Sequence, residues 1–359
     1  SISGLIMCRR IGKVTCRCFL FTVIPWNILL MWVLSRNHPY ELSYGPPSDV
    51  PVVTVHLLSS SISTKTANTT TWPATNPASI KDLVASYCKA HPKDSDLHNM
   101  HNQNLGGLFF ADKKRNLLFA LNFKVAASTL IRSVPNSSGL VPPNEVEGLE
   151  DVDLRTPAKL RKYGLSHINM KRKNSLKSTE KYFKFMFVRN PYKRLLSGFR
   201  DKFRIHSAAQ LPDEWFTSTV NQVVTKYRTE GEELLAPKLN ETAITFEEFL
   251  KLVIDEHKKL RTMNEHWKPL YLQSMPCIVN YTFIGKFETF TQDFQYLMSK
   301  IAVTQVPEVK MHSSPGASTG HVFKKYWSQI PPNIVQQIAR IFTRDFEMFN
   351  YNKDLNYYL

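Results

Sequence analysis

The chain has 359 residues, with 46 Lys and Arg against 30 Asp and Glu and a formal net charge of +16. Its length suits one large domain or two ordinary ones, and 43% hydrophobic residues are enough for a sizeable core. The positive charge indicates an anionic partner, which could be nucleic acid, anionic lipid, nucleotide or acidic polysaccharide, although a basic composition can also serve solubility alone. The spacing of Cys and His excludes a structural zinc site of the usual kind.

An apolar segment near the N-terminus predicts a membrane anchor. Residues 19–34 are apolar except for Pro25 and Asn27, basic residues precede them, and Arg36 is the only basic residue close behind. This imbalance predicts a cytosolic tail over residues 1–18, an anchor over residues 19–35 and a lumenal location for the rest. A cleaved signal peptide is the alternative, but no small-residue cleavage motif follows Leu34 closely.

Residues 36–80 are predicted to form a flexible stem, because they are rich in Ser, Thr, Pro and Asn and lack apolar periodicity. The globular domain is expected over residues 81–359. Four acceptor triplets for N-glycosylation agree with a lumenal location, and their asparagines are Asn68, Asn136, Asn240 and Asn280.

A first strand–loop–helix unit is expected in residues 116–134. Residues 117–123 form a short apolar run typical of a buried strand, Lys124 and five small residues follow, and residues 130–134 are amphipathic. A helix that starts directly after such a turn presents free backbone N–H groups to an anion, and Lys124 adds a positive charge. Ser128 or Thr129 could add hydroxyl hydrogen bonds. An ordinary turn with a surface lysine is the alternative, since the glycine pattern of a P-loop is absent.

A second unit is expected in residues 182–203. Residues 183–188 predict another buried strand, and Arg189 stands at its C-terminal end, where α/β sheets bind ligands. Asn190 and Pro191 then end the strand and suit the first turn of a helix. That helix carries Arg194, Ser197 and Lys202. The alternative is a surface helix with solvated charges.

Together the two units resemble the carbohydrate sulfotransferases of the HNK-1 and chondroitin/dermatan 4-O-sulfotransferase type (the sulfotransferase 2 family). In that family a PKVACTNW-like loop receives the 5′-phosphosulfate of the donor PAPS, and an RxPfxRLxSaxxxKF-like element receives its 3′-phosphate. The counterparts here are residues 123–130 and 189–203. Residues 264–289 and 326–351 also look like family signatures, so the resemblance spans residues 81–352.

The resemblance implies an α/β fold, the P-loop-like sulfotransferase fold, with a central parallel sheet flanked by helices. It implies a type II Golgi membrane enzyme that transfers a sulfuryl group from PAPS to a glycan hydroxyl without a metal. The expected acceptor is an acidic glycan or proteoglycan, with the 4-O of GalNAc in chondroitin or dermatan as the first candidate and the 3-O of a terminal uronic acid as the second. Nucleic acid is not an expected partner, because the domain is expected in the lumen.

The resemblance also assigns roles to individual residues. Lys124 is expected to contact the oxygens of the phosphosulfate, and Arg189 and Ser197 to hold the 3′-phosphate. His266 is our candidate for the catalytic base because histidine titrates near lumenal pH, and a structural histidine beside Trp267 is the alternative. The remaining expected donor contacts are Val125, Ala126, Ala127, Ser128, Thr129, Leu130, Asn190, Pro191 and Arg194.

The sequence departs from the family pattern at several positions. Phe123, Ala127 and Leu130 replace the family's proline, cysteine and tryptophan, and family cysteines are absent at Ala120 and Ser274. Cys88 and Cys277 remain as the lumenal thiols and are predicted to pair. The altered loop keeps open a lumenal glycan-binding protein of sulfotransferase fold that has lost activity. A P-loop phosphotransferase is disfavoured, since neither a Gly-rich loop nor acidic magnesium ligands are evident.

Two further expectations concern the acceptor and the C-terminus. Basic clusters at residues 113–115 and 161–173 are candidates for binding the acceptor, with Arg200 and Arg204 at the edge of the cleft. A helix is predicted over residues 332–349, with its buried face formed by Ile334, Ile338, Ile341 and Phe342.

Overall fold

The chain divides into two units, residues 1–70 and residues 71–359. The computed structural model describes residues 6–10, 16–20, 79–95, 107–136, 161, 164–204, 214–228, 242–259, 263–301 and 320–359. In the first unit, β1 (Ile6–Arg10) pairs antiparallel with β2 (Cys16–Leu20). No helix within the described ranges is long and apolar enough to cross a membrane. The expected anchor, apart from Phe19 and Leu20 in β2, and the expected stem up to residue 78 lie outside those ranges.

The second unit contains a five-stranded sheet with the order β5-β3-β4-β6-β7. The bounds are β3 (Leu108–Asp112), β4 (Leu117–Leu121), β5 (Leu165–His167), β6 (Phe183–Val188) and β7 (Phe283–Lys286). Strands β4, β6 and β7 are parallel, and β6 has the predicted bounds. The expectation of a parallel sheet is wrong for the other side, where β3 runs antiparallel to both β4 and β5. The reason is local, because only a short turn joins β3 to β4, and short turns connect antiparallel strands.

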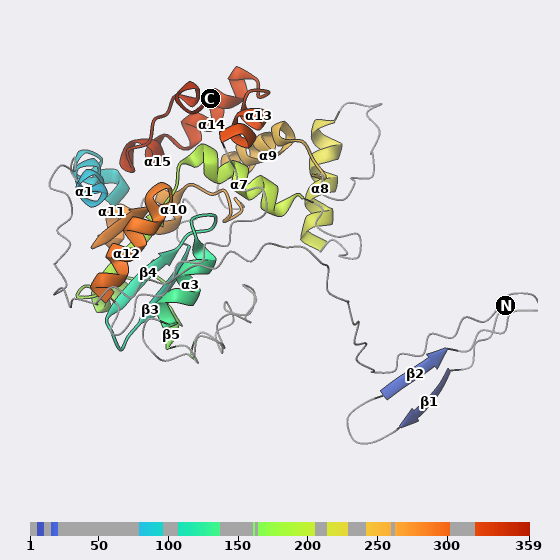
Figure 1. The fold of residues 1–359 in the computed structure, drawn as a ribbon, viewed down its shortest axis with the longest axis horizontal. Helices are drawn as coiled ribbons and strands as arrows, with labels where there is room; N and C mark the ends of the chain where they lie inside the picture. The colour runs from blue at the N-terminus through green and yellow to red at the C-terminus, as the bar shows by residue number, and fades with distance from the viewer. Residues whose placement is uncertain are drawn as a thin grey trace, which may run out of the picture. The chain divides into compact units, whose positions relative to one another are not determined.

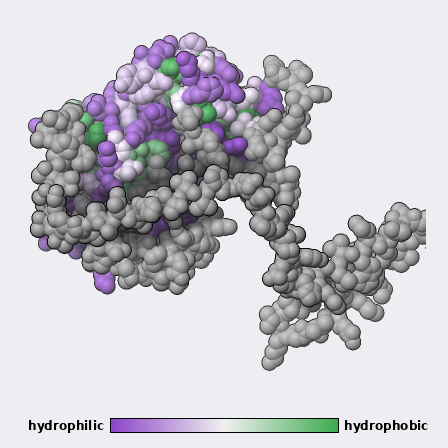
Figure 2. All heavy atoms as spheres, in the orientation of Figure 1, coloured by the Kyte–Doolittle hydropathy of each residue, from purple (hydrophilic) through white to green (hydrophobic). Residues whose placement is uncertain are grey.

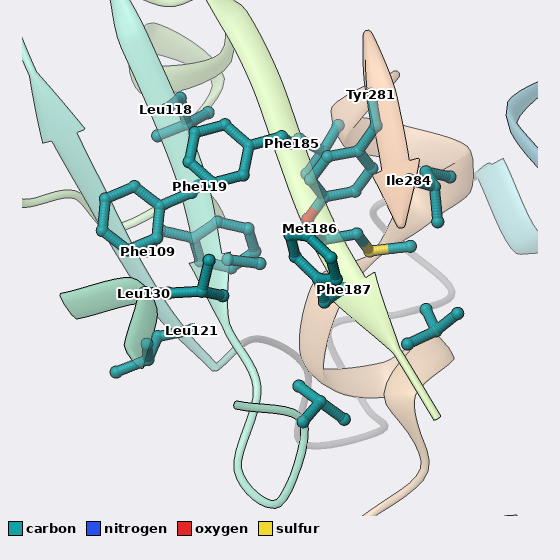
Figure 3. Packing of buried hydrophobic residues seen from close by; sticks show 14 of the residues in the cluster. Phe109, Leu118, Phe119, Leu121, Leu130, Phe185, Met186, Phe187, Tyr281 and Ile284 are labelled. Atoms are coloured by element: carbon teal, nitrogen blue, oxygen red, sulfur yellow. The ribbon is translucent and has the colours of Figure 1, made fainter. Parts of the chain in front are cut away.

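A helix follows each of the three parallel strands. Helix α3 (Ala127–Asn136) follows β4, α7 (Pro191–Lys202) follows β6, and α12 (Phe290–Ile301) follows β7 through the 3₁₀ turn η3 (Phe287–Thr289). The strands pack their aromatic residues against one another, and Figure 3 shows Phe119 of β4 beside Phe185 of β6. Their rings stack with centroids 5.2 Å apart. The sheet and its flanking helices thus share one apolar core.

A second apolar core lies among the helices that Figure 1 shows grouped beside the sheet. It joins α7 to α8 (Glu214–Tyr227), α9 (Phe246–Lys259), α13 (Gly320–Trp327) and α14 (Pro332–Ile341). The coloured surface over these helices in Figure 2 is mostly hydrophilic, with hydrophobic residues only in small patches. Helix α7 belongs to this core through Tyr192, Leu195 and Phe199, although it starts at the edge of the sheet. It therefore connects the two cores.

The predicted C-terminal helix over residues 332–349 is wrong as a single helix. Helix α14 ends at Ile341, Phe342 leaves the helical conformation with its side chain fully buried, and α15 (Thr343–Met348) starts afresh. Ile334 and Ile338 are buried as expected, while Ile341 is only half-buried. The break allows the buried Asp345 to accept hydrogen bonds from the backbone N–H groups of Leu270 and Tyr271, 2.7 and 2.9 Å away.

A disulfide ties the start of the second unit to the sheet region. Cys88 of α1 (Ile80–Ala90) is bonded to Cys277 of α11 (Pro276–Val279), with 5.3 Å between the Cα atoms. These are the two cysteines that follow the expected anchor, and the sequence predicts that they pair. The remaining elements are η1 (Pro92–Ser95), α6 (Lys173–Ser178), α10 (Leu270–Ser274) and η4 (Leu355–Tyr358).

Candidate functional site

The loop between β4 and α3 has an unusual backbone. Lys124 and Ala126 both adopt positive φ angles, 65° and 64°, which side-chain-bearing residues rarely adopt. Such strain persists only where the surroundings enforce it, and it is common at ligand sites. Here the preceding Asn122 is anchored from both sides, since it donates to the carbonyl of Phe187 (3.1 Å) and accepts from the hydroxyl of Ser274 (2.8 Å). Ser274, which stands where the family has a cysteine, thus supports the loop.

Arg189 leaves the end of β6 and reaches this loop. Its Nη1 donates to the carbonyl of Lys124 at 3.0 Å, and its guanidinium stacks on the ring of Phe287, 4.1 Å from the centroid. Burial lowers the pKa of Arg189 to about 10, while the charge of Glu288 opposes that shift, so the side chain stays cationic. Its buried Nε has no hydrogen-bond partner in the described part of the chain. A buried cationic donor of this kind suits an anionic ligand.

The ammonium of Lys124 forms an ion pair with Asp201 on the last turn of α7, with 3.1 Å between Nζ and Oδ1. Burial lowers the pKa of Lys124, and Asp201 opposes that shift. Burial alone would raise the pKa of Asp201, but the charges of Lys124 and Lys202 hold it below its usual value. The carboxylate of Asp201 is therefore ionised at neutral pH, and it lies against the amine of Lys124.

His266 lies next to the same loop. Its ring packs on that of Phe123, with centroids 4.4 Å apart. The side-chain oxygen of Asn264 accepts from the backbone N–H of His266 (2.9 Å) and also faces Nδ1 (2.8 Å). A backbone N–H can only donate, so the Asn264 atom is the oxygen, and Nδ1 must carry a proton. The neutral imidazole then has its lone pair on Nε2. Trp267 donates instead to Glu256, at 2.7 Å.

Arg194 holds these segments together. It is fully buried, and its guanidinium donates to the carbonyls of Phe123 (3.1 Å), Lys268 (2.8 Å) and Glu265 (3.2 Å). Burial lowers its pKa to about 10, which leaves it cationic. The sequence placed Arg194 among the donor contacts. That stays a prediction, and in the structure each of its three nitrogen atoms donates to a backbone carbonyl near Lys124 or His266.

The family model described as "Sulfotransferase family" matches residues 108–352, more than half of the chain and all of the site described above. The chain belongs to the sulfotransferase family. It is 26% identical to mouse (Mus musculus) carbohydrate sulfotransferase 11 over 281 residues, which cover 76% of this chain and 75% of the relative. It is 28% identical to mouse carbohydrate sulfotransferase 12 over 300 residues (77% and 68%) and 32% identical to human carbohydrate sulfotransferase 9 over 176 residues (47% and 38%). No solved structure gives a significant match.

The other residues that are expected to contact the donor in this sulfotransferase differ in how far their side chains are buried. Val125 and Leu130 bury their side chains completely, and Thr129 is also buried, so only their backbone could face a donor. Ala126, Ala127 and Ser128 are half-buried, as is Ser197 on α7. Asn190 and Pro191 are buried and start that helix, with the side chain of Asn190 capping Lys193 N at 3.1 Å. Asn190 and Pro191 therefore also form the start of α7.

The basic cluster at residues 113–115, which the sequence offers as a candidate for binding the acceptor, lies at the opposite end of β4 from Lys124. Residues 113–115 precede β4, whereas Lys124 follows it, and a five-residue strand separates its ends by roughly 16 Å. Arg115 is also engaged, because it pairs with Asp112 (2.7 Å) and donates to the carbonyl of Val134 (2.8 Å). Within the described residues, no group of three or more His, Cys, Asp and Glu could hold a metal ion.

Sequence reasoning missed Asp201 and Glu288. Glu288 accepts from the backbone N–H of Asn190 (2.9 Å) and from the hydroxyl of Tyr351 (2.8 Å), and thereby braces the start of α7 beside Arg189. A signal for Asp201 was present, because it follows Arg194 by seven residues and so shares its helix face. No local pattern pointed to Glu288.

Proposed function

We propose that the chain transfers the sulfuryl group of PAPS to a hydroxyl of a glycan, with the 4-O of GalNAc in chondroitin or dermatan as the first candidate acceptor. The main support is the convergence of two segments 65 residues apart, where Arg189 donates to the carbonyl of Lys124. This brings both cations to the C-terminal edge of two parallel strands, where α/β folds bind nucleotides. The names of the relatives support a carbohydrate acceptor.

The donor would meet this edge with its two anionic ends. We assign Lys124 and the backbone of residues 125–130 to the phosphosulfate, and Arg189 with Ser197 to the 3′-phosphate. The alternating positive φ angles turn backbone N–H groups toward a concave side, which suits an anion. The buried Nε of Arg189 offers a further donor. PAPS supplies the activated sulfuryl group, and the reaction needs no metal.

His266 is the proposed base. Its Nδ1–H is fixed by Asn264, and the lone pair on Nε2 can accept the proton of the acceptor hydroxyl. Phe123, which replaces the family proline, packs on the imidazole and adds to its orientation. Arg194 donates to the carbonyls of Phe123 and Glu265, which precede Lys124 and His266. It therefore fixes the position of the loop with the base relative to the loop with the lysine.

The acceptor would approach along the loop after His266. Lys268 is buried in this loop, and burial lowers its pKa to about 8, with Lys171 lowering it further and Glu265 opposing. Lys171 also borders a cavity of about 190 Å³ that Phe109, Met170 and Met275 help to line. A lysine at the border of a partly apolar cavity suits a sugar ring that carries a carboxylate or sulfate, as in an acidic glycan or proteoglycan.

A Golgi location as a type II membrane protein completes the proposal. The disulfide between Cys88 and Cys277 suits an oxidising compartment. Asn280 is exposed with a positive φ of 53°, as an N-glycosylation acceptor in a turn can be. Asn136 ends α3, while Asn68 and Asn240 lie outside the described residues. A lower apparent mass of the membrane-bound Asn280→Gln variant than of wild type on gel electrophoresis, with the difference abolished by enzymatic removal of N-glycans, would support a lumenal location of this domain.

The function is tested by label transfer from radiolabelled PAPS to a panel of desulfated chondroitin, dermatan and glycans ending in a uronic acid. Lys124→Ala is expected to reduce transfer about 10³-fold, the size typical of losing one group that stabilises developing negative charge. Lys325→Ala, which removes an exposed lysine from the last turn of α13, is the matched control and should retain wild-type transfer. Binding of PAPS or glycan without any transfer would instead support the alternative, a catalytically impaired glycan-binding protein.

A further inference from the structure

One face of α7 contacts both halves of the site. Arg194, Gly198 and Asp201 follow one another at spacings of four and three residues, and such residues share a helix face. Arg194 donates to the carbonyl of Phe123, and Gly198 lies so close to the next loop that a Cβ there would be 3.5 Å from the carbonyl oxygen of His266. Asp201, at the end of this face, is ion-paired with Lys124.

Asp201 influences the proposed base as well as the lysine. The charged groups that act on its carboxylate are Lys124, Lys202 and His266, and each of them lowers its pKa. Lys202 is its second ion-pair partner, with 3.5 Å between Nζ and Oδ2. Around Lys124, the charged neighbours are Asp201, Lys202 and Arg189. Asp201 therefore acts electrostatically on both Lys124 and His266.

The ion pair with Asp201 occupies the ammonium that the donor needs. An anionic phosphosulfate would compete with Asp201 for Lys124, and Arg189 and Lys202 add positive charge that favours the donor. The side chain of Asp201 is 37% exposed, so its carboxylate can turn away without leaving a buried charge unpaired. Once the lysine has moved to the donor, the carboxylate keeps its ion pair with Lys202 and still acts electrostatically on His266, which packs against Gly198 on the same face of α7.

We propose that Asp201 is a positioning residue that serves Lys124 and His266 in turn. Before the donor binds, it holds the ammonium of Lys124 in place. During transfer, it stabilises the positive charge on His266, as a carboxylate does for an imidazole base. In that step the acceptor oxygen bonds to sulfur, and the sulfur–oxygen bond to the 5′-phosphate of PAPS breaks with its electron pair on the phosphate. The hydroxyl proton moves to Nε2 of His266 and then to water. This role rests on the proposed function.

Asp201→Asn separates the two halves of the role. Equilibrium binding of 3′-phosphoadenosine 5′-phosphate, measured by calorimetry, should be roughly 2- to 5-fold tighter, because the lysine no longer has to leave a partly exposed ion pair. The turnover number should fall roughly 10- to 100-fold, since the base loses its stabilising neighbour. Without the carboxylate the pKa of the imidazole falls, so the acid limb of the kcat–pH profile should move to lower pH by roughly half a unit to one unit.

Two control variants make these shifts specific. Asp201→Glu keeps a carboxylate and should recover part of the turnover number and the wild-type acid limb. Glu247→Gln removes a carboxylate of equal exposure, 37%, from an ion pair with Lys251 on α9 (2.8 Å) and should change none of the three quantities. A merely structural role for Asp201 would instead weaken nucleotide binding and lower the unfolding temperature together.

The proposal is wrong if Asp201→Asn weakens nucleotide binding, or if it leaves both the turnover number and the acid limb unchanged. Should Asp201→Asn fail to fold, Asp201→Glu decides, because a folded Glu variant without measurable turnover would contradict a role that needs only a carboxylate at this position. A wild-type chain that binds the nucleotide but transfers no sulfate would overturn the proposed function. In that case, equal nucleotide affinity of wild type and Asp201→Asn would separately contradict the proposal that Asp201 holds Lys124 before the donor binds.

Discussion

The two strand–helix junctions of the site reach the same edge of the sheet by different physical means. After β4 the chain makes a turn with two positive φ angles before α3 starts, and Lys124 lies within that turn. After β6 only Arg189 and Asn190 intervene, and the side chain of Asn190 caps α7 in the ordinary way. The first junction thus carries strain and exposes backbone, whereas the second is regular and delivers one long cationic side chain. A strained turn needs external support, and α7 supplies it through Arg194.

The largest expected effect on stability comes from removing the Arg194 side chain that supports the first junction. Arg194→Met should lower the free energy of unfolding by about 3–5 kcal/mol, because two buried carbonyls and a partly buried one lose their donor and the buried Asp345 loses a nearby positive charge. Denaturant unfolding measures the loss. Lys193→Met, one residue earlier and half-exposed, should stay within about 0.5 kcal/mol of wild type. Equal stability of the two variants would mean that the strained turn does not depend on α7.

Arg189→Ala tests whether the second junction contributes its side chain to the donor. We expect roughly 30- to 100-fold weaker binding of 3′-phosphoadenosine 5′-phosphate, the cost of losing a buried charge-assisted contact. Adenosine 5′-phosphosulfate, which lacks the 3′-phosphate, should bind wild type and variant about equally. A similar loss for both nucleotides would place Arg189 at the phosphosulfate end instead, next to Lys124.

Asn190→Ala tests the regular cap of the second junction. The side chain accepts from Lys193 N at 3.1 Å, and loss of such a cap costs about 1 kcal/mol of stability. Asn190→Asp retains an acceptor at this position and should recover most of the loss in thermal unfolding. An alanine variant as stable as wild type would show that Pro191 and the bond from Asn190 N to Glu288 suffice to start α7.

The smallest effect has the opposite sign and concerns the first junction. Ala126→Gly should stabilise the chain by up to about 1 kcal/mol, because glycine adopts a positive φ without strain, although it gains entropy in the unfolded state. Ala127→Gly, at the first residue of α3, should instead lower the free energy of unfolding by a similar amount. A destabilised Ala126→Gly would contradict the view that the turn holds its lysine at a conformational cost.

Much of this architecture follows from local sequence. Apolar runs predicted β4 and β6, the latter with its observed bounds, and Asn190-Pro191 predicted where α7 begins. The sequence also predicted the pair Cys88–Cys277. The short turn between β3 and β4 escaped notice, and the sheet is therefore mixed rather than parallel. Apolar periodicity over residues 332–349 did not reveal the break at Phe342, because that residue suits the buried face with or without a bend.

Sequence by itself determined that a lysine and an arginine follow two buried strands, since strand periodicity and helix-start signals depend on neighbouring residues only. Tertiary structure alone decided that all three nitrogen atoms of Arg194 donate to carbonyls, whereas Arg189, five positions earlier, keeps a buried Nε without a hydrogen-bond partner in the described part of the chain. Arg194 is committed because carbonyls of residues 123, 265 and 268 meet around it, and those positions lie more than 70 residues away along the chain. Asp201 also owes its partner to tertiary structure, because the packing of α7 against the loop after β4 brings Lys124 to it.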